Sequence, residues 1–220
     1  LLALCLFAST ACASTFIDAH GNEIQLDDSL EAYAAVTLVG ANDAARQGET
    51  NLGDLWTDAL RWFAVSGEIN AAFDEDDVKA GNDHIAVDAD HVVALWNGGN
   101  LRADIAEGTF GAEALAELLP FPNNFAVVYM SGAQLLEALE AASQALPYTA
   151  ETADACASLM QVSGLTYTVD TTKAYDALEA YGDHWFTAGS VSRVSITDVN
   201  GQPFDEAAVY AVITSNANFN

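Results

Sequence analysis

Basic residues are scarce in this chain. Its 220 residues include 6 Lys and Arg against 32 Asp and Glu, which gives a formal net charge of -26 at pH 7. A field of that sign repels the phosphates of nucleic acids and the surface of anionic membranes. We therefore expect no nucleic-acid partner, and only a local cluster of the few Arg side chains could hold a small phosphate group.

Cysteine and long apolar runs are also in short supply. The cysteines are Cys5, Cys12 and Cys156, and no paired-Cys zinc motif occurs. The apolar run at residues 1–8 has the length of a signal-peptide core but is too short to span a bilayer. Small residues follow it, and residues 11–13 (Ala-Cys-Ala) fit a cleavage site. We predict a signal peptide at residues 1–13 whose beginning is missing, and no transmembrane segment.

Such a leader implies export. The protein is expected to be secreted, periplasmic or on the cell surface, and processing at Cys12 as a lipoprotein is the alternative. After cleavage Cys156 would be the only cysteine left, so no internal disulfide could form. We expect Cys156 to be a small buried hydrophobe.

Hydrophobic residues, in contrast, make up 51% of the chain, which is enough for a substantial core in one domain. Apolar residues recur every three or four positions from 52 to 63 and predict an amphipathic helix. Ser131 and Gln134 form a capping box for a second helix, and the alanine-rich residues 30–35 also favour helix. The acidic, poorly patterned residues 69–90 predict a surface excursion. Strands are predicted at residues 91–96, 124–130, 159–170, 191–199 and 209–214. The mixture indicates an α+β (mixed α/β) fold in a single domain.

A glycine-rich turn follows the first of these strands. Residues 96–104 read WNGGNLRAD, in which Asn97, Gly98 and Gly99 are followed by Arg102. Gly and Asn tolerate positive φ, so such a turn can bend sharply and expose backbone N–H groups. The Asn97 amide and the Arg102 guanidinium could then hold phosphate or ribose oxygens. A purely structural turn with a nearby Arg gives the same pattern.

Two further residues have chemistry that would suit a nucleotide. Arg46 stands just before the helix predicted at residues 52–63, whose N-terminal end favours an anion. An ordinary capped helix with a solvated Arg is the alternative. Phe121 lies between two prolines, so its ring is held on a stiff turn and could stack on a planar base. Simple burial of Phe121 in the core is the alternative there.

Metal ligands and catalytic motifs are not evident in the sequence. Three Asp-His pairs, at residues 83–84, 90–91 and 183–184, lie on acidic, surface-like stretches with no sign of converging ligands. No G-x-S-x-G motif occurs. We therefore assign no catalytic residue, no metal site and no cofactor to this chain.

Five blocks of sequence follow one another in a recognisable order. They are R-x-x-E-x-N-L-G-x-L at residues 46–55, N-G-G-x-x-R-A at 97–103, L-P-F at 119–121, S-G-A-Q-L-L-E-A-L-E at 131–140 and M-Q-V-S-G-L-x-Y at 160–167. This order resembles the C-terminal domain of the 5'-nucleotidase family. The resemblance predicts that domain at residues 46–220, preceded by an N-terminal extension at residues 14–45. Residues 218–220 resemble a family segment that leads into a second stacking aromatic, so a truncated C-terminus is expected.

The resemblance also implies roles for individual residues. Arg46 and Arg102 would contact phosphate or ribose oxygens, Asn97 would hydrogen-bond the base and Phe121 would stack on it, beside the two turn glycines. In that family a pair of divalent metals on an N-terminal domain performs the chemistry. We therefore expect the metal pair on a catalytic domain missing from this chain, or on a separate metallophosphoesterase chain.

Two functions are compatible with these observations. The first is a nucleotide- or nucleoside-recognising domain of a secreted 5'-nucleotidase-type phosphoric-ester hydrolase, which would not be catalytic alone. The alternative is a non-catalytic envelope protein, either nucleoside-binding or structural. The preferred base and the oligomeric state do not follow from the sequence.

Overall fold

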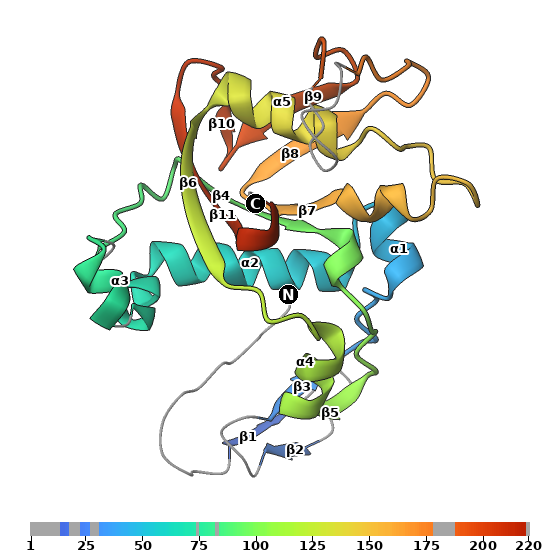
Figure 1. Ribbon diagram of the computed structural model, residues 1–220. Coiled ribbons are helices and arrows are strands. Elements are labelled where there is room, and N and C mark those ends of the chain that lie inside the picture. The colour runs from blue at the N-terminus through green and yellow to red at the C-terminus, as the bar shows by residue number, and fades with distance from the viewer. Residues whose placement is uncertain are drawn as a thin grey trace.

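The computed structural model describes residues 14–17, 23–26, 31–73, 75–81, 84–177 and 188–218 (Figure 1). The strands are β1 (Ser14–Ile17), β2 (Glu23–Leu26), β3 (Ala32–Ala34), β4 (Val92–Asn97), β5 (Gly108–Phe110), β6 (Phe125–Ser131), β7 (Met160–Ser163), β8 (Leu165–Val169), β9 (Val194–Val199), β10 (Gln202–Pro203) and β11 (Val209–Ser215). The α-helices are α1 (Asn42–Gln47), α2 (Asn51–Val65), α3 (Glu75–Lys79), α4 (Ala112–Leu118) and α5 (Gly132–Ala142). Short 3-10 turns are η1 (Glu68–Ala72), η2 (Gly98–Asn100), η3 (Ala155–Ser158) and η5 (Asn216–Asn218). The predicted mixed α+β class is confirmed, and the predicted signal peptide lies outside the described residues.

A four-stranded sheet in the order β6-β11-β4-β7 forms the centre of the domain. β4 and β11 run parallel, and β6 and β7 join them antiparallel at the two edges. Val92, Ala94 and Trp96 of β4 pack in one core cluster with side chains of α2, whereas Val93 and Leu95 pack in the other with side chains of α5. Both faces of the sheet are therefore covered, which explains the continuous apolar run in β4. Figure 1 shows α2 below this sheet and α5 above it.

Helix α2 supports the lower face of the sheet. The Thr50 hydroxyl accepts a hydrogen bond from the Gly53 N–H at 3.1 Å and closes the first turn. The apolar stripe then buries Leu52, Leu60 and Ala64 against the sheet. The helix predicted from the periodicity of residues 52–63 is confirmed.

Helix α5 covers the opposite face together with the three-stranded sheet β10-β9-β8. The predicted capping box is present: the Ser131 N–H donates to Gln134 Oε1 at 2.9 Å, and the Gln134 N–H donates to Ser131 Oγ at 3.3 Å. Farther along α5, the fully buried Glu140 carboxylate accepts the backbone N–H groups of Arg193 and Val194 at 3.0 and 2.8 Å. These bonds join α5 to the start of β9.

Residues 30–35, predicted to favour helix, contain strand β3 instead, so that prediction was wrong. β3 pairs antiparallel with β5, and this long-range pairing outweighs the intrinsic helix preference of alanine, which amounts to a few tenths of a kcal/mol per residue. Ala34, Leu38 and Ala45 are buried in the core. Residues 31–45 therefore pack as part of the domain, a point that the sequence left open.

The single strand predicted at residues 159–170 is divided into β7 and β8, which belong to different sheets. Gly164 separates them with a φ of +82°, in the left-handed region. A Cβ at this position would lie 2.8 Å from the Arg61 side chain and the Val92 carbonyl oxygen. Glycine thus permits the chain to leave the central sheet at this point.

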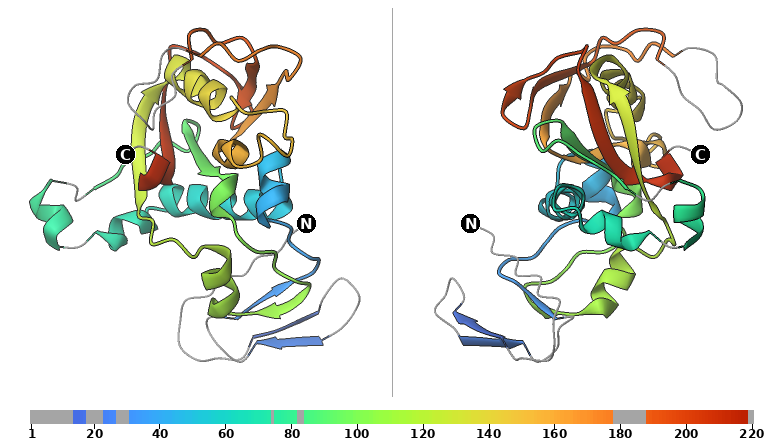
Figure 2. Two further views of the ribbon diagram at one scale, coloured as in Figure 1. Left: turned by 45° about the vertical axis from the view of Figure 1, so that its right-hand side comes forward. Right: turned by 90° about the vertical axis from the view of Figure 1, so that its left-hand side faces the viewer.

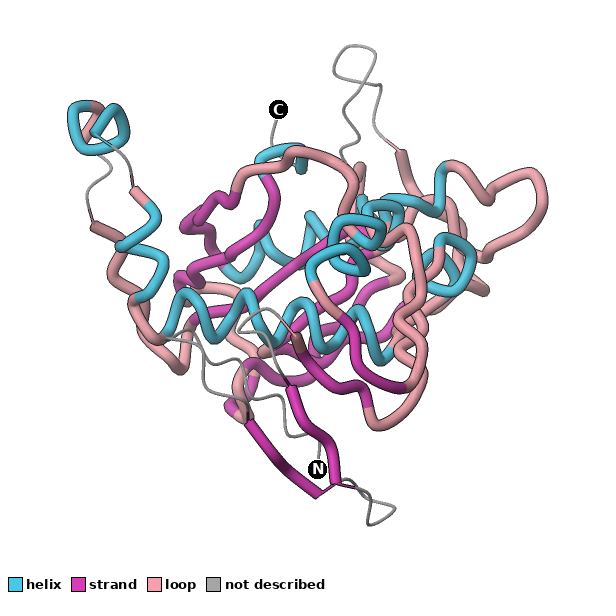
Figure 3. Tube along the Cα trace, turned by 90° about the horizontal axis from the view of Figure 1, so that it is seen from below, coloured by secondary structure: helices cyan, strands magenta, loops and turns pink. Residues whose placement is uncertain are grey.

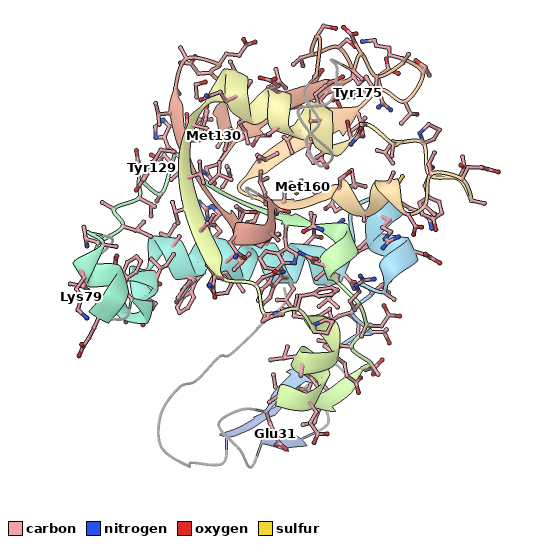
Figure 4. The ribbon with its side chains drawn as sticks, in the orientation of Figure 1. Glu31, Lys79, Tyr129, Met130, Met160 and Tyr175 are labelled. Atoms are coloured by element: carbon pink, nitrogen blue, oxygen red, sulfur yellow. The ribbon has the colours of Figure 1, made fainter. Side chains whose placement is uncertain are left out.

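The acidic segment between α2 and β4 projects from the body of the domain, as predicted. Figures 1, 2 and 3 all show α3 at its outer end, and Figure 4 labels Lys79 there. The returning chain contacts β6, where the Tyr129 hydroxyl donates to the Ala86 carbonyl at 2.8 Å. Within the described ranges, no helix combines the length and the apolar character that crossing a bilayer requires.

Candidate functional site

Three short elements meet at the carboxyl end of β4, and they bring the predicted turn next to Arg46. η2 continues β4 and packs between α1 and η3. The Gly98 N–H donates to the Leu159 carbonyl at 2.7 Å. A Cβ on Gly98 would overlap the Ala45 carbonyl oxygen, and one on Gly99 would lie 2.5 Å from the Ala157 methyl carbon.

The sequence suggested that the two glycines are needed for positive φ, but the structure shows that they are needed for close packing. Neither Gly98 nor Gly99 has a positive φ, and both are buried. The turn is tight because two neighbouring backbones approach it closely, and the Gly98 N–H is already bonded. Contact of these glycines with a ligand stays a prediction.

The side chain of Asn97 is oriented by the same three elements. Its Nδ2 donates to the Ala157 carbonyl at 3.2 Å, and its Oδ1 accepts from Asn100 Nδ2 at 2.7 Å. A carbonyl-type oxygen has two lone pairs, so Oδ1 retains capacity for one more donor. Hydrogen bonding of Asn97 to a base is not tested by the fold and stays a prediction.

Arg46, on α1, is directed toward the segment that leads into η3. Its Nη1 donates to the Ala153 carbonyl at 2.9 Å and lies 3.4 Å from Asp154 Oδ1. Only 12% of the Arg46 side chain is exposed, whereas Asp154 is fully exposed. Cys156, in the same segment, is free and buried, as predicted. The chain itself therefore supplies the partners of Arg46 in this structure.

Arg102 and Phe121, predicted from separate segments, lie together. The Arg102 guanidinium carbon is 5.0 Å from the centre of the Phe121 ring, within the range of a cation–π contact. The Arg102 N–H also donates to the Leu118 carbonyl at 3.0 Å, which joins the end of α4 to the chain after the turn. Phe121 is 43% exposed, so simple burial in the core does not describe it.

The two groups of predicted residues are linked through Asp104. Its Oδ1 accepts the N–H groups of Gly40 and Ala41, both at 2.8 Å, just before α1 begins. The segment that bears Arg102 is thereby tied to the approach to the helix that bears Arg46. The predicted residues thus form one pair, Arg102 with Phe121, and one cluster around α1, η2 and η3.

Gln161 holds this corner to the central sheet, a role that was not predicted. Its Nε2 donates to the carbonyls of Ala45 and Gly48 at 3.0 and 2.9 Å, and its Oε1 accepts the Thr50 N–H at 3.0 Å. The side chain is 1% exposed. Every bond joins residues more than 100 positions apart, so only the presence of Gln161 in the M-Q-V-S-G-L block hinted at it.

An aromatic cluster, also not predicted, anchors the end of β4. The rings of Trp56 and Trp96 are 5.3 Å apart in an edge-to-face arrangement, and Phe125 lies 6.4 Å from each. Phe125 is 44% exposed. Trp96 immediately precedes Asn97, so the cluster fixes the strand end from which the turn departs.

A shallow hollow of about 630 Å³ lies at the corner between α1 and α2. It is lined by Val39, Ala44, Gln47, Gly48, Glu49, Thr50 and Asn51. The six predicted site residues are not among these, although Arg46 precedes Gln47 on α1. Because the acidic Glu49 is one of the lining residues, the hollow itself is poorly suited to a phosphate.

Asp54, in the first turn of α2, titrates abnormally at the same corner. Burial, together with the nearby carboxylates of Glu49 and Asp58, raises the pKa of Asp54 to about 6. The folded chain therefore binds a proton at Asp54 more tightly than the unfolded chain does. Its stability should fall as the pH rises from about 4 to about 6, and then level off.

We expect Asp54→Asn to stabilise the domain at pH 7.5 and to leave it unchanged below pH 4. The gain should be about 1 kcal/mol, reduced from the full linkage value because solvent screens a partly exposed carboxylate. Urea unfolding of both forms across this pH range measures it. Glu117→Gln, which removes an exposed charge on α4, is the control for net charge. An equal gain in that variant would contradict the role of Asp54.

The metal pair that the resemblance implies is expected on another domain or chain, not among the residues of this one. Among the residues that the structure describes, no group of three or more His, Cys, Asp or Glu side chains is arranged to hold a metal ion. The Nδ1 of His91 lies 2.7 Å from Asp88 Oδ2, so this imidazole pairs with Asp88 rather than with its neighbour in sequence. Of the other Asp-His candidates, Asp83, Asp183 and His184 lie outside the described residues.

Comparison with known proteins gives one family and several relatives. The model of the family described as 5'-nucleotidase, C-terminal domain, matches residues 30–220. The trifunctional nucleotide phosphoesterase protein YfkN of Bacillus subtilis (strain 168) is 28% identical over 125 residues, which cover 56% of this chain and 7% of that protein.

Among solved structures, the 5'-nucleotidase precursor from Thermus thermophilus aligns with a TM-score of 0.55 and 22% identity over 93% of this chain and 44% of that one. A putative 5'-nucleotidase from Staphylococcus aureus aligns with a TM-score of 0.46 and 15% identity, over 93% and 40% of the two chains. The Thermus likeness shows a shared fold. The chain spans less than half the length of each of these relatives.

Proposed function

The chain belongs to the family of 5'-nucleotidase C-terminal domains, and on that premise we propose that it recognises a nucleotide or nucleoside for a secreted 5'-nucleotidase-type phosphoric-ester hydrolase. The observation that carries the proposal is the contact between Arg102 and Phe121. It places a cation and a partly exposed aromatic ring side by side. A nucleoside monophosphate presents the complementary pair, an anionic ester and a planar base.

Each predicted residue has a task in this proposal. Phe121 offers its exposed ring for stacking on the base, and Arg102 directs its guanidinium fork to phosphate or ribose oxygens. Asn97 offers its remaining amide capacity to the base edge. Arg46 is a second cation for the phosphate, although its Nη1 is engaged by residues 153 and 154.

We assign the hydrolytic chemistry to a partner metallophosphoesterase domain or chain with two divalent metal ions. This assignment is supported by the family relation. The domain proposed here would orient the ester, and no bond-breaking step is attributed to its own side chains.

Arg102→Ala and Phe121→Ala should each weaken the binding of AMP by about 1–3 kcal/mol, the usual cost of losing a charged hydrogen bond or a base stack. Calorimetric titration of AMP into the two variants and the parent chain measures this. Lys173→Ala, which removes an exposed cation elsewhere, serves as the control. Unchanged AMP affinity in both site variants would remove this pair from the binding site.

Export is part of the same proposal and is supported by the apolar leader at residues 1–8. Fractionation of cells that express the gene would test it. Recovery of the protein with its leader intact in the cytoplasm would oppose export.

A further inference from the structure

The guanidinium of Arg46 is held by a loop from a distant part of the chain. Ala153 and Asp154, which contact it, lie 107 and 108 positions later in the sequence. The carbonyl of Ala153 accepts at 2.9 Å, and the Asp154 carboxylate stands 3.4 Å from the same nitrogen. This loop, residues 147–154, is here called the α1 strap because its side chains and backbone contact α1.

The α1 strap has a second attachment to the helix and an internal structure. The Tyr148 hydroxyl donates to Asp43 Oδ1 at 3.1 Å, one turn before Arg46 on α1. Within the strap, the Thr149 N–H donates to the Thr152 hydroxyl at 2.8 Å, and that hydroxyl donates to the Pro147 carbonyl at 3.0 Å. The position of the Asp154 carboxylate therefore follows from a folded loop attached at both ends.

Carboxylate and phosphate oxygens bind to the same N–H donors of an arginine. Both are anionic acceptors that match the fork of N–H donors, so one occupant of Arg46 competes with the other. The chain has only 6 basic residues against 32 acidic ones, so an internal carboxylate that contacts one of these cations leaves less positive charge for an anionic ligand. The strap thus reduces the attraction that Arg46 can offer to a phosphate.

We propose that Asp154 is a specificity-determining residue of the nucleotide site. Its carboxylate competes with the ligand phosphate for Arg46 and shifts the preference of the site from the nucleoside monophosphate toward the uncharged nucleoside. This inference rests on the proposed function. Asp154 is fully exposed, and exposed ion pairs contribute little to folding, so removing its charge leaves the fold intact.

The test is the binding of AMP and of adenosine to the parent chain, Asp154→Asn and Glu151→Gln, at low ionic strength. Glu151 lies on the same strap, and its substitution changes the net charge equally without touching Arg46. Asp154→Asn should bind AMP about three- to fivefold more tightly, as expected for one exposed ion pair, with adenosine affinity unchanged. Glu151→Gln should match the parent chain for both ligands.

A thermodynamic cycle isolates Arg46 as the target of the competition. In an Arg46→Ala background, Asp154→Asn should give no gain in AMP affinity, because the cation released by the substitution is absent. A persistent gain in that background, an equal gain in Glu151→Gln, or no gain in Asp154→Asn would overturn the inference. Failure of every variant to bind either ligand would instead overturn the proposed function, and this role of Asp154 with it.

Discussion

Gly98→Ala is expected to destabilise the domain by about 3 kcal/mol, at the upper end of the usual cost of overpacking a core. The new Cβ would overlap the Ala45 carbonyl oxygen, a backbone atom of α1 that cannot rotate away as a flexible side chain can. The turn is also fixed from the other side, since the Gly98 N–H is bonded to the Leu159 carbonyl. Either α1 or the turn must move, so weaker nucleotide binding should accompany the loss of stability.

Urea unfolding compares this variant with Gly48→Ala. Gly48 lies at the end of the same helix, has an extended φ of 177°, and its added Cβ would meet nothing within 4 Å. Its substitution should change the free energy of unfolding by no more than about 0.5 kcal/mol. Equal stability of the two variants would contradict the close packing of α1 on the turn.

Arg193→Met should destabilise the domain by about 3 kcal/mol, the order expected when backbone carbonyls lose a buried, charged hydrogen-bond donor. Arg193 is 2% exposed, and its guanidinium donates to the carbonyls of Ser143, Gln144 and Leu146, which follow the end of α5. The substitution leaves these acceptors without their donor.

The matched control for Arg193→Met is Lys173→Met, which removes the same charge from a half-exposed side chain paired with Asp170 at 3.6 Å. That pair should contribute less than about 1 kcal/mol. Chemical denaturation followed by circular dichroism gives both values. If the two substitutions cost the same, the connection between α5 and the start of β9 would not depend on Arg193.

Sequence patterns predicted correctly those elements that depend on interactions between residues close together in the chain. The stripe at residues 52–63 became α2, and the capping box at Ser131 opens α5, because helix periodicity and caps involve residues three or four positions apart. The apolar run of β4 was also readable, since a strand covered on both faces has no polar alternation. Strand β3 was misread because its partner β5 lies more than 70 positions later in the chain.

In the candidate site, too, local features were predicted and long-range contacts were not. Arg46, Asn97, Arg102 and Phe121 were singled out from local chemistry and from family motifs, and both depend on residues that are near one another along the chain. The hydrogen bonds of Gln161 and the contact of Asp154 with Arg46 join residues more than 100 positions apart, and no local pattern encodes such pairs. The glycine-rich turn was located correctly. The reason for its glycines is close packing rather than positive φ, and this could be recognised only once the neighbouring backbone was known.

The most direct test of the central claim is a calorimetric titration of AMP and adenosine into the purified chain, with phosphate release assayed in parallel after addition of zinc or manganese. Saturable binding of one or both ligands without phosphate release is the result that nucleotide recognition by this domain, with catalysis elsewhere, predicts. No binding of either ligand would contradict recognition and favour a structural role, and metal-dependent release of phosphate would contradict the assignment of catalysis to a partner.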